Sequence, residues 1–177
     1  MSAIDRTAIG RLAALPLATV LLTSCGAEGG AVGAVATGHF SARHHFPVLR
    51  IAWCGESPPA RIDVVSDEHH WRLTAKTDFP GDEVEVDLSA PGEDWDITDG
   101  SGAAAYRVVP GSPSTEYTLG VTSVAGVENE DEAGEEYDIA SLRFDTETLA
   151  AEDGLYMGTH RSDEGTVVRA DDFPPEC

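Results

Sequence analysis

The side chains best suited to metal chemistry lie in one acidic stretch of the sequence. Between residues 128 and 138 the carboxylates are Glu128, Glu130, Asp131, Glu132, Glu135, Glu136 and Asp138. Calcium takes about six to eight oxygen ligands, so a high carboxylate density is the minimum requirement for its binding. The stretch has no fixed ligand spacing, however, and a run of like charges is usually a solvated loop. We therefore favour a solvated loop and keep Glu130, Asp131 and Glu132 as weak candidates for a cation site.

The histidines are the other candidate metal ligands. His69 and His70 are adjacent in the sequence, and adjacent side chains of a strand point to opposite faces, so they cannot bind one ion together. A zinc or copper site would need the fold to bring another histidine, such as His160, close to His69. The spacings His-x-His and His-x-x-x-His are absent. We favour surface histidines and keep His69 and His160 as weak candidates.

Motifs of enzyme active sites are absent from the sequence. Nucleophilic catalysis needs a nucleophile, a base and a group that orients the base, and a Gly-x-Ser-x-Gly elbow is one sign of it. The sequence contains no such elbow, no glycine-rich phosphate loop and no dinucleotide fingerprint. We therefore predict a protein that is not an enzyme and needs no cofactor. A hydrolase with an unrecognised site stays open as an alternative.

The N-terminal stretch contains a short apolar run after two arginines. The run from Leu12 to Leu22 has no charge and follows Arg6 and Arg11. At about 1.5 Å per helical residue it falls well short of the ~30 Å hydrocarbon core of a membrane. A basic start, a short apolar segment and small residues after it are typical of a secretory signal peptide. A buried helix is less favoured because Pro16 interrupts the run.

The end of this run carries a resemblance to a known family. Leu22-Thr23-Ser24-Cys25 resembles the lipobox of bacterial lipoproteins, which has an apolar residue, two small residues and a cysteine. The resemblance covers residues 1–25 and implies cleavage before Cys25 and a diacylglyceryl group on its sulfur. Two acyl chains anchor a protein stably, whereas one holds it only marginally. We expect a protein attached to the extracytoplasmic face of the cell membrane. A plain signal peptide that leaves Cys25 as a thiol is the alternative.

Two cysteines remain if Cys25 carries lipid, as the resemblance implies. They are Cys54 and Cys177, and an exported protein meets an oxidising environment in which an even pair is most simply a disulfide. For so long a loop the chain-entropy model gives about 4 to 5 kcal/mol of stabilisation. Two unpaired thiols and a two-cysteine metal site are the alternatives.

The composition is strongly acidic. There are 32 acidic and 11 basic residues, which gives a net charge of -21. Binding to nucleic acid, or to an anionic membrane through the protein surface, needs a basic patch, and none is present. Cations or a basic partner would be attracted instead. We favour a composition bias of the source, because Lys76 is the sole lysine.

The chain divides into three parts by pattern. Residues 1–24 are the expected signal peptide, and residues 25–45 the lipidated N-terminus and a glycine-rich flexible linker. From residue 46 to residue 177, apolar and polar residues alternate in short pieces separated by turn residues, which predicts β-strands. The pieces are 49–53, 62–64, 71–75, 84–88, 95–97, 106–109, 117–121, 139–144, 154–157 and 166–169, with a helical turn expected at 146–152.

This pattern predicts an all-β domain, which we expect to be a single antiparallel β-sandwich, immunoglobulin-like in architecture at most. Asp99-Gly100 indicates a hairpin turn. Trp71, Trp95 and Tyr106 could form an aromatic platform for a sugar or a protein. Because Trp71 and Trp95 are in phase with apolar neighbours, we favour core packing for them.

Together these patterns favour a lipid-anchored binding or interaction module of the cell envelope. Its contact with the membrane would be the lipid on Cys25, and its ligand or partner protein is not specified by any motif. A metal- or calcium-binding lipoprotein and a hydrolase remain the alternatives.

Overall fold

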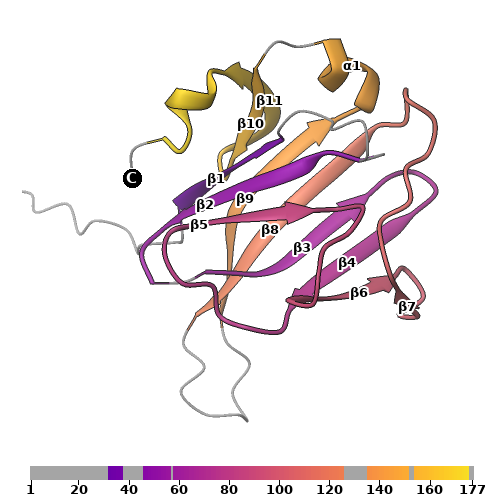
Figure 1. The fold of residues 1–177 in the computed structure, drawn as a ribbon, viewed down its shortest axis with the longest axis horizontal. Coiled ribbons are helices and arrows are strands. Elements are labelled where there is room, and N and C mark those ends of the chain that lie inside the picture. Colours follow the sequence, from indigo (N-terminus) through magenta and orange to yellow (C-terminus); the bar gives the residue numbers. More distant parts are fainter. Residues whose placement is uncertain (1–31, 38–45, 57, 126–134, 152–153, 176–177) are drawn as a thin grey trace, which may run out of the picture.

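The computed structural model describes residues 32–37, 46–56, 58–125, 135–151 and 154–175, and these residues form mainly strands (Figure 1). The all-β prediction is confirmed. The strands are β1 (Val32–Thr37), β2 (Val48–Cys54), β3 (Pro59–Val65), β4 (His70–Ala75), β5 (Glu83–Asp87), β6 (Trp95–Asp99), β7 (Ala104–Ala105), β8 (Tyr117–Ala125), β9 (Glu135–Phe144), β10 (Leu155–Thr159) and β11 (Ser162–Val168). The expected helical turn is α1 (Thr146–Ala151), and a 3-10 turn (Ala170–Asp172) follows β11.

The described strands form one curled sheet rather than the expected two-sheet sandwich. Its order is β5-β2-β1-β10-β11-β9-β8-β3-β4-β6-β7 across 11 described strands. Neighbouring strands are antiparallel except β9 and β11, which run parallel and meet at Arg143 and Glu164. This contact joins what would otherwise be two layers, so the sheet curls into a half-barrel (Figure 1). Alternation along a strand indicates which face is buried but not which strand lies beside it, so the sequence predicted the all-β class but did not specify the half-barrel arrangement.

The inner face of the half-barrel holds one main core. The alternating apolar residues of β2, β3, β4, β8 and β9 point into it, including Leu49, Ile51, Ile62, Val64, Leu73, Leu119, Val121 and Leu142. Trp71 and Trp95 are 6% and 5% exposed. Core packing of these two tryptophans is thus confirmed.

Strand β1 lies in the segment that we expected to be a flexible linker. It pairs with β2 on one side and with β10 on the other, so that Ala34 faces both Ala52 and Thr159. Val35 belongs to the main core. The linker prediction for 25–45 was therefore wrong at residues 32–37, and the rest of that range lies outside the described residues. A central strand covered on both faces has no polar alternation, and the small residues of β1 gave no other signal.

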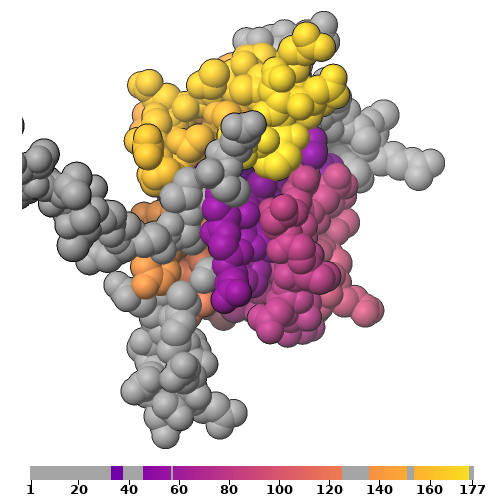
Figure 2. Space-filling model, turned by 90° about the vertical axis from the view of Figure 1, so that its left-hand side faces the viewer, coloured from indigo at the N-terminus to yellow at the C-terminus, as the bar shows by residue number. Residues whose placement is uncertain are grey.

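A C-terminal strap, residues 170–175, covers the outer face of β1 and β2. Phe173 is buried in a small cluster with Ala34, Ala36, Ala52 and Leu155. The alanines leave room for its ring on the outer side of the sheet. In Figure 2 the C-terminal residues lie directly against the N-terminal strands.

One end of the half-barrel, which we call the mouth, gathers several strand ends. A short turn joins the end of β2 at Cys54 to the start of β3 at Pro59. The end of β4 pairs with the start of β6 through Ala75 and Trp95. The first residue of β1, Val32, pairs with Cys54. The mouth therefore holds the start of β1, the turn after β2 and the loop after β4.

Candidate functional site

A hollow of about 820 Å³ opens at the mouth. Its lining comes from the turn after β2, the end of β4 with the following loop, and the end of β8. The lining residues are Glu56, Pro58, Pro59, Ala60, Ala75, Lys76, Thr77, Asp78, Phe79 and Val124. Segments far apart in the sequence thus form one site at the open end of the sheet.

The mouth hollow has an apolar floor. Ala75 and Phe79 pack against the main core, and the Phe79 ring stacks on Trp95 with 5.1 Å between ring centroids. This stacking fixes the Phe79 ring in place. Val124 adds a partly exposed apolar side chain.

The rim of the mouth hollow carries negative charge. Glu56 and Asp78 are exposed, and within the described residues no hydrogen bond or ion pair engages either carboxylate. Lys76 is the basic lining residue, and its ammonium lies 3.5 Å from Asp96, which offsets its charge. The rim therefore presents two free carboxylates beside apolar surface.

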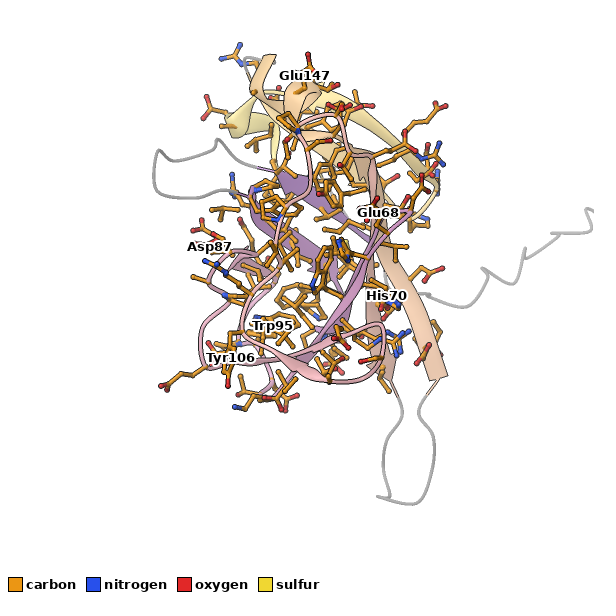
Figure 3. The ribbon with its side chains drawn as sticks, turned by 90° about the vertical axis from the view of Figure 1, so that its right-hand side faces the viewer. Glu68, His70, Asp87, Trp95, Tyr106 and Glu147 are labelled. Carbon is orange, nitrogen blue, oxygen red and sulfur yellow. The ribbon has the colours of Figure 1, made fainter. Side chains whose placement is uncertain are left out.

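A second exposed feature is the Tyr106 ridge, which we define as Tyr106, Arg107 and Val109. Tyr106 is 95% exposed and Val109 is 51% exposed, and Figure 3 shows Tyr106 at the outer margin of the molecule. No carboxylate of the described residues lies in ion-pair range of Arg107. A hollow of about 350 Å³ adjoins the ridge and is lined by Ser89, Arg107, Val108, Val109, Pro110, Gly111, Pro113 and Thr146.

Buried contacts hold the ridge in place. Val108, between the exposed residues, is fully buried in the core, and its N–H donates to the Leu88 carbonyl at 3.0 Å. Further along, the Gly111 N–H donates to the Tyr117 hydroxyl at 2.6 Å. The strand predicted at 106–109 was wrong, because β7 ends at Ala105 and Val108 bonds to the loop after β5.

A charged network covers the outer face of β3, β4 and β9. The Asp63 carboxylate accepts hydrogen bonds from Arg61 at 3.0 Å, His70 at 2.7 Å and Arg72 at 2.9 Å. Arg61 also donates two bonds to Glu136, at 2.6 and 2.8 Å. Partial burial raises the pKa of Asp63, but the bonds from His70 and Arg72 and the arginine charges outweigh it and hold this pKa below its usual value. The bond and charge of Arg61 lower the pKa of Glu136.

In this network His70 is hydrogen-bonded to Asp63, the arrangement in which a catalytic histidine base is oriented by a carboxylate. Nucleophilic catalysis also needs a hydroxyl or thiol in reach of the base. Among the described residues, His70 hydrogen-bonds to Asp63 and to no hydroxyl or thiol. Both Asp63 oxygens are shared with arginines. The hydrogen bonds of the network connect the three strands β3, β4 and β9.

The histidines proposed as weak metal ligands are not grouped. His69 is exposed, with its ring centroid 5.1 Å from that of Trp71. His160 is half-buried and accepts a bond from Arg161 at 3.3 Å. Among the described residues there is no group of three or more His, Cys, Asp or Glu side chains that could hold a metal ion. Glu130, Asp131 and Glu132, like Cys25, lie outside the described residues.

The cysteine at the mouth is oxidised. Cys54 is disulfide-bonded, and Cys177 lies outside the described residues, so its pairing with Cys54 stays a prediction. The strap supports that pairing. Phe173 packs with Ala52, and Ala52 and Cys54 share the outer face of β2 because they are two residues apart on a strand.

Sequence reasoning did not find the mouth hollow. The turn residues around Pro58 and Phe79 marked two loops, but nothing in the sequence brings these loops together. The exposed Tyr106 was considered for an aromatic platform, whereas its expected partners Trp71 and Trp95 lie in the core. The motif Asp99-Gly100 was informative, because the Asp99 carboxylate accepts bonds from the Ser101 and Ala103 N–H groups at 2.9 and 3.0 Å and closes the predicted hairpin.

Comparison of the chain with protein-family models, with curated proteins and with solved structures finds no match. In the part of the chain that the structure describes, no helix has the length and apolar character needed to cross a membrane.

Proposed function

We propose that this chain is a lipid-anchored binding module on the extracytoplasmic face of the cell membrane, and that it contacts a partner protein through the Tyr106 ridge. The observation that carries the proposal is the 95% exposure of Tyr106 beside the fully buried Val108. Burial of Val108 holds the backbone of the ridge in place, so Tyr106 projects from a defined position on the surface. Fixed presentation lowers the conformational cost of binding.

The residue types of the ridge suit a protein interface. Tyrosine and arginine are enriched among the residues that contribute most to binding, and each such residue costs about 2 kcal/mol or more when truncated. The guanidinium of Arg107 is free to form two parallel hydrogen bonds with a carboxylate of the partner. The hollow beside Val109 can take an apolar side chain. The partner is thus expected to present an acidic and an apolar residue close together.

The lipid anchor is supported by the lipobox residues and by the position of β1. Residues 26–31 separate Cys25 from the first residue of β1. At full extension this segment spans about 25 Å. A diacylglyceryl group on Cys25 would thus keep the domain close to the bilayer, where a partner in the envelope is within reach.

Fractionation of the native host tests the anchor. The wild-type protein is expected in the membrane fraction, with an N-terminal peptide whose mass includes the lipid on Cys25. The Cys25→Ala variant is expected to lose the lipid and the processing. Wild-type protein with an unmodified Cys25 thiol would contradict the anchor.

Crosslinking in the same host tests the ridge. A photoreactive phenylalanine analogue at position 106 is expected to give a covalent adduct with one protein, and the same analogue at Val167, which is exposed on β11 and lines neither hollow, is not. Adding Arg107→Ala should remove the adduct. An adduct that forms equally at both positions, or that survives Arg107→Ala, would contradict a specific interface.

A further inference from the structure

The mouth hollow is a candidate for a binding site separate from the Tyr106 ridge. We propose that it binds a basic peptide segment, with an arginine or lysine at the rim and an apolar side chain on the floor. The proposal needs neither the lipid on Cys25 nor the ridge.

The size and position of the hollow suit a ligand. Ligand pockets have volumes of roughly 300 to 1,000 Å³ and occur in the mouths of β-barrels. The hollow measures about 820 Å³ and lies at the open end of a half-barrel. A volume of this size accepts more than one side chain, which favours a peptide over a single small amine.

The floor selects an apolar group. Pro58, Phe79 and Val124 line the hollow and keep some surface exposed, so covering them by a ligand removes apolar surface from water. The stacking of Phe79 on Trp95 fixes the ring, with a 24° angle between the two planes. A fixed aromatic ring at the edge of a hollow also attracts a cation placed over its face.

The rim selects a positive charge. Glu56 and Asp78 line the hollow, and no described residue forms a hydrogen bond or an ion pair with either carboxylate, whereas Lys76 is offset by Asp96. Two more exposed acids, Asp82 and Asp94, lie at the mouth. Their backbone carbonyls accept hydrogen bonds from residues there: the Trp53 N–H donates to Asp82, and the Lys76 N–H donates to Asp94. The whole chain carries a net charge of -21, which raises the local concentration of cationic ligands.

A metal ion is a poorer fit than a peptide. A cation such as calcium needs about six to eight oxygen atoms that converge on one point. The described residues hold no group of three or more acids, histidines or cysteines arranged in that way. The apolar floor would also contribute nothing to a metal site. The combination of free carboxylates and apolar surface fits an amphipathic peptide.

The test uses the purified full chain and does not depend on lipid at Cys25. The probe is a fluorescein-labelled peptide in which leucine and arginine alternate, and the comparison peptide has glutamate in place of arginine. Fluorescence anisotropy is expected to detect binding of the arginine peptide and not of the glutamate peptide. The double variant Glu56→Gln/Asp78→Asn should weaken binding by about tenfold or more, equal to about 1.4 kcal/mol.

A matched control separates the site from general charge attraction. Glu147→Gln/Asp172→Asn removes the same two charges from exposed positions in α1 and the strap, and it should leave the affinity unchanged. An equal loss in both double variants would overturn the proposal, because the attraction would then be non-specific. Absence of binding would overturn it too. Far-UV circular dichroism of each variant verifies folding.

Discussion

The guanidinium carbon of Arg50 lies 4.8 Å from the centroid of the Phe173 ring, so the C-terminal strap and strand β2 are in contact through a cation and an aromatic ring. Arg50 is itself held by Glu83 on β5 at 2.7 Å. Cation–π contacts of this kind contribute about 0.5 to 1 kcal/mol at exposed sites. The burial of the ring against Ala34, Ala36 and Ala52 adds the larger apolar contribution. The strap is therefore part of the folded domain rather than a tail.

The first prediction concerns this ring. Replacing Phe173 by alanine should lower the free energy of unfolding by about 3 to 5 kcal/mol, because it removes a buried ring and uncovers the outer face of β1. Urea unfolding followed by tryptophan fluorescence measures the change. Val167→Ala is the control, since Val167 is 42% exposed on β11 and should change stability by less than about 0.5 kcal/mol. An equal effect of the two substitutions would mean that the strap contributes little.

The second prediction concerns the disulfide of Cys54. Digestion without reduction should release a peptide pair that joins Cys54 to Cys177, because the strap lies on the same face of β2 as Cys54. Mass spectrometry with and without reduction identifies the pair. Cys177→Ala should destabilise the domain, by up to about 4 to 5 kcal/mol on the chain-entropy model. A Cys54 peptide linked to Cys25 would contradict both this pairing and the lipid anchor.

The third prediction concerns close packing between β10 and β9. A Cβ added at Gly158 would clash with the Ser141 carbonyl oxygen, whereas one added at Gly120 would meet no atom within 4 Å. Gly158→Ala should therefore destabilise the protein by about 3 kcal/mol, the upper end of the usual range for overpacking. Gly120→Ala, also in a strand, should be tolerated. Thermal unfolding of the two variants makes the comparison, and similar melting temperatures would contradict this packing.

Alternation of apolar and polar residues predicts a strand only where one face of the strand is exposed to solvent, and this limited how much of the fold the sequence could predict. Apolar and polar residues alternate clearly from Glu83 to Asp87 because one face of β5 is exposed to solvent, and the position of this strand was predicted correctly. Strand β1 was missed because Ala34, Val35 and Ala36 are buried on both faces and show no polar alternation. The parallel contact of Arg143 with Glu164 was not predictable, since pairing across a sheet depends on the whole topology and not on local pattern.

In the candidate sites too, features built from neighbouring residues could be predicted, whereas features that join distant segments could not. Tyr106 is a single conspicuous residue in the sequence, but its exposure could not be predicted from the apolar residues around it, of which Val108 is buried and Val109 exposed. The mouth hollow joins Glu56, Asp78 and Val124 from three separate segments, so no local motif could indicate it. The hairpin at Asp99 was predictable, because the turn is built from hydrogen bonds within five consecutive residues.

The fourth prediction concerns the acid dependence of the Asp63 network. The ordinary pKa values of Asp63 and Glu136 are 3.8 and 4.5, and both are lowered in the folded protein. A carboxyl group whose pKa is lower in the folded than in the unfolded state stabilises the fold above its unfolded pKa. That contribution is lost as the pH falls through the folded pKa. Stability should therefore decrease as the pH is lowered from about 5 to about 3.

The variant Asp63→Asn separates this network from general acid effects. It should lose roughly 1 to 2 kcal/mol at neutral pH, because three donors lose a charged acceptor, and its stability should depend less on pH in the acid range. Glu85→Gln is the control, since Glu85 is exposed on β5 and takes part in no hydrogen bond or ion pair of the described residues. Urea unfolding at a series of pH values gives both curves. Parallel curves for the wild type and Asp63→Asn would contradict the role of the network.

The fifth prediction follows from the short distance between Cys25 and β1. If the lipid is attached at Cys25, residues 26–31 limit Val32 to within about 25 Å of the lipidated sulfur. Val32 pairs with Cys54 at the mouth, so the mouth should be the end of the domain nearest the bilayer. A fluorophore on a cysteine introduced at Thr77, which is exposed and lines the mouth hollow, should therefore be quenched strongly by nitroxide-labelled lipids.

The same fluorophore at Glu147 provides the comparison. Glu147 lies in α1, after the last residue of β9, whereas β9 begins near the mouth, so the length of a ten-residue strand separates it from that end. At about 3.3 Å per residue this separation is about 30 Å, and quenching at Glu147 should be much weaker. Inserting a Gly-Ser segment after Gly26 should reduce the difference by lengthening the tether. Equal quenching at both positions in a membrane-bound, lipidated protein would show that the tether does not orient the domain, while leaving the anchor itself intact.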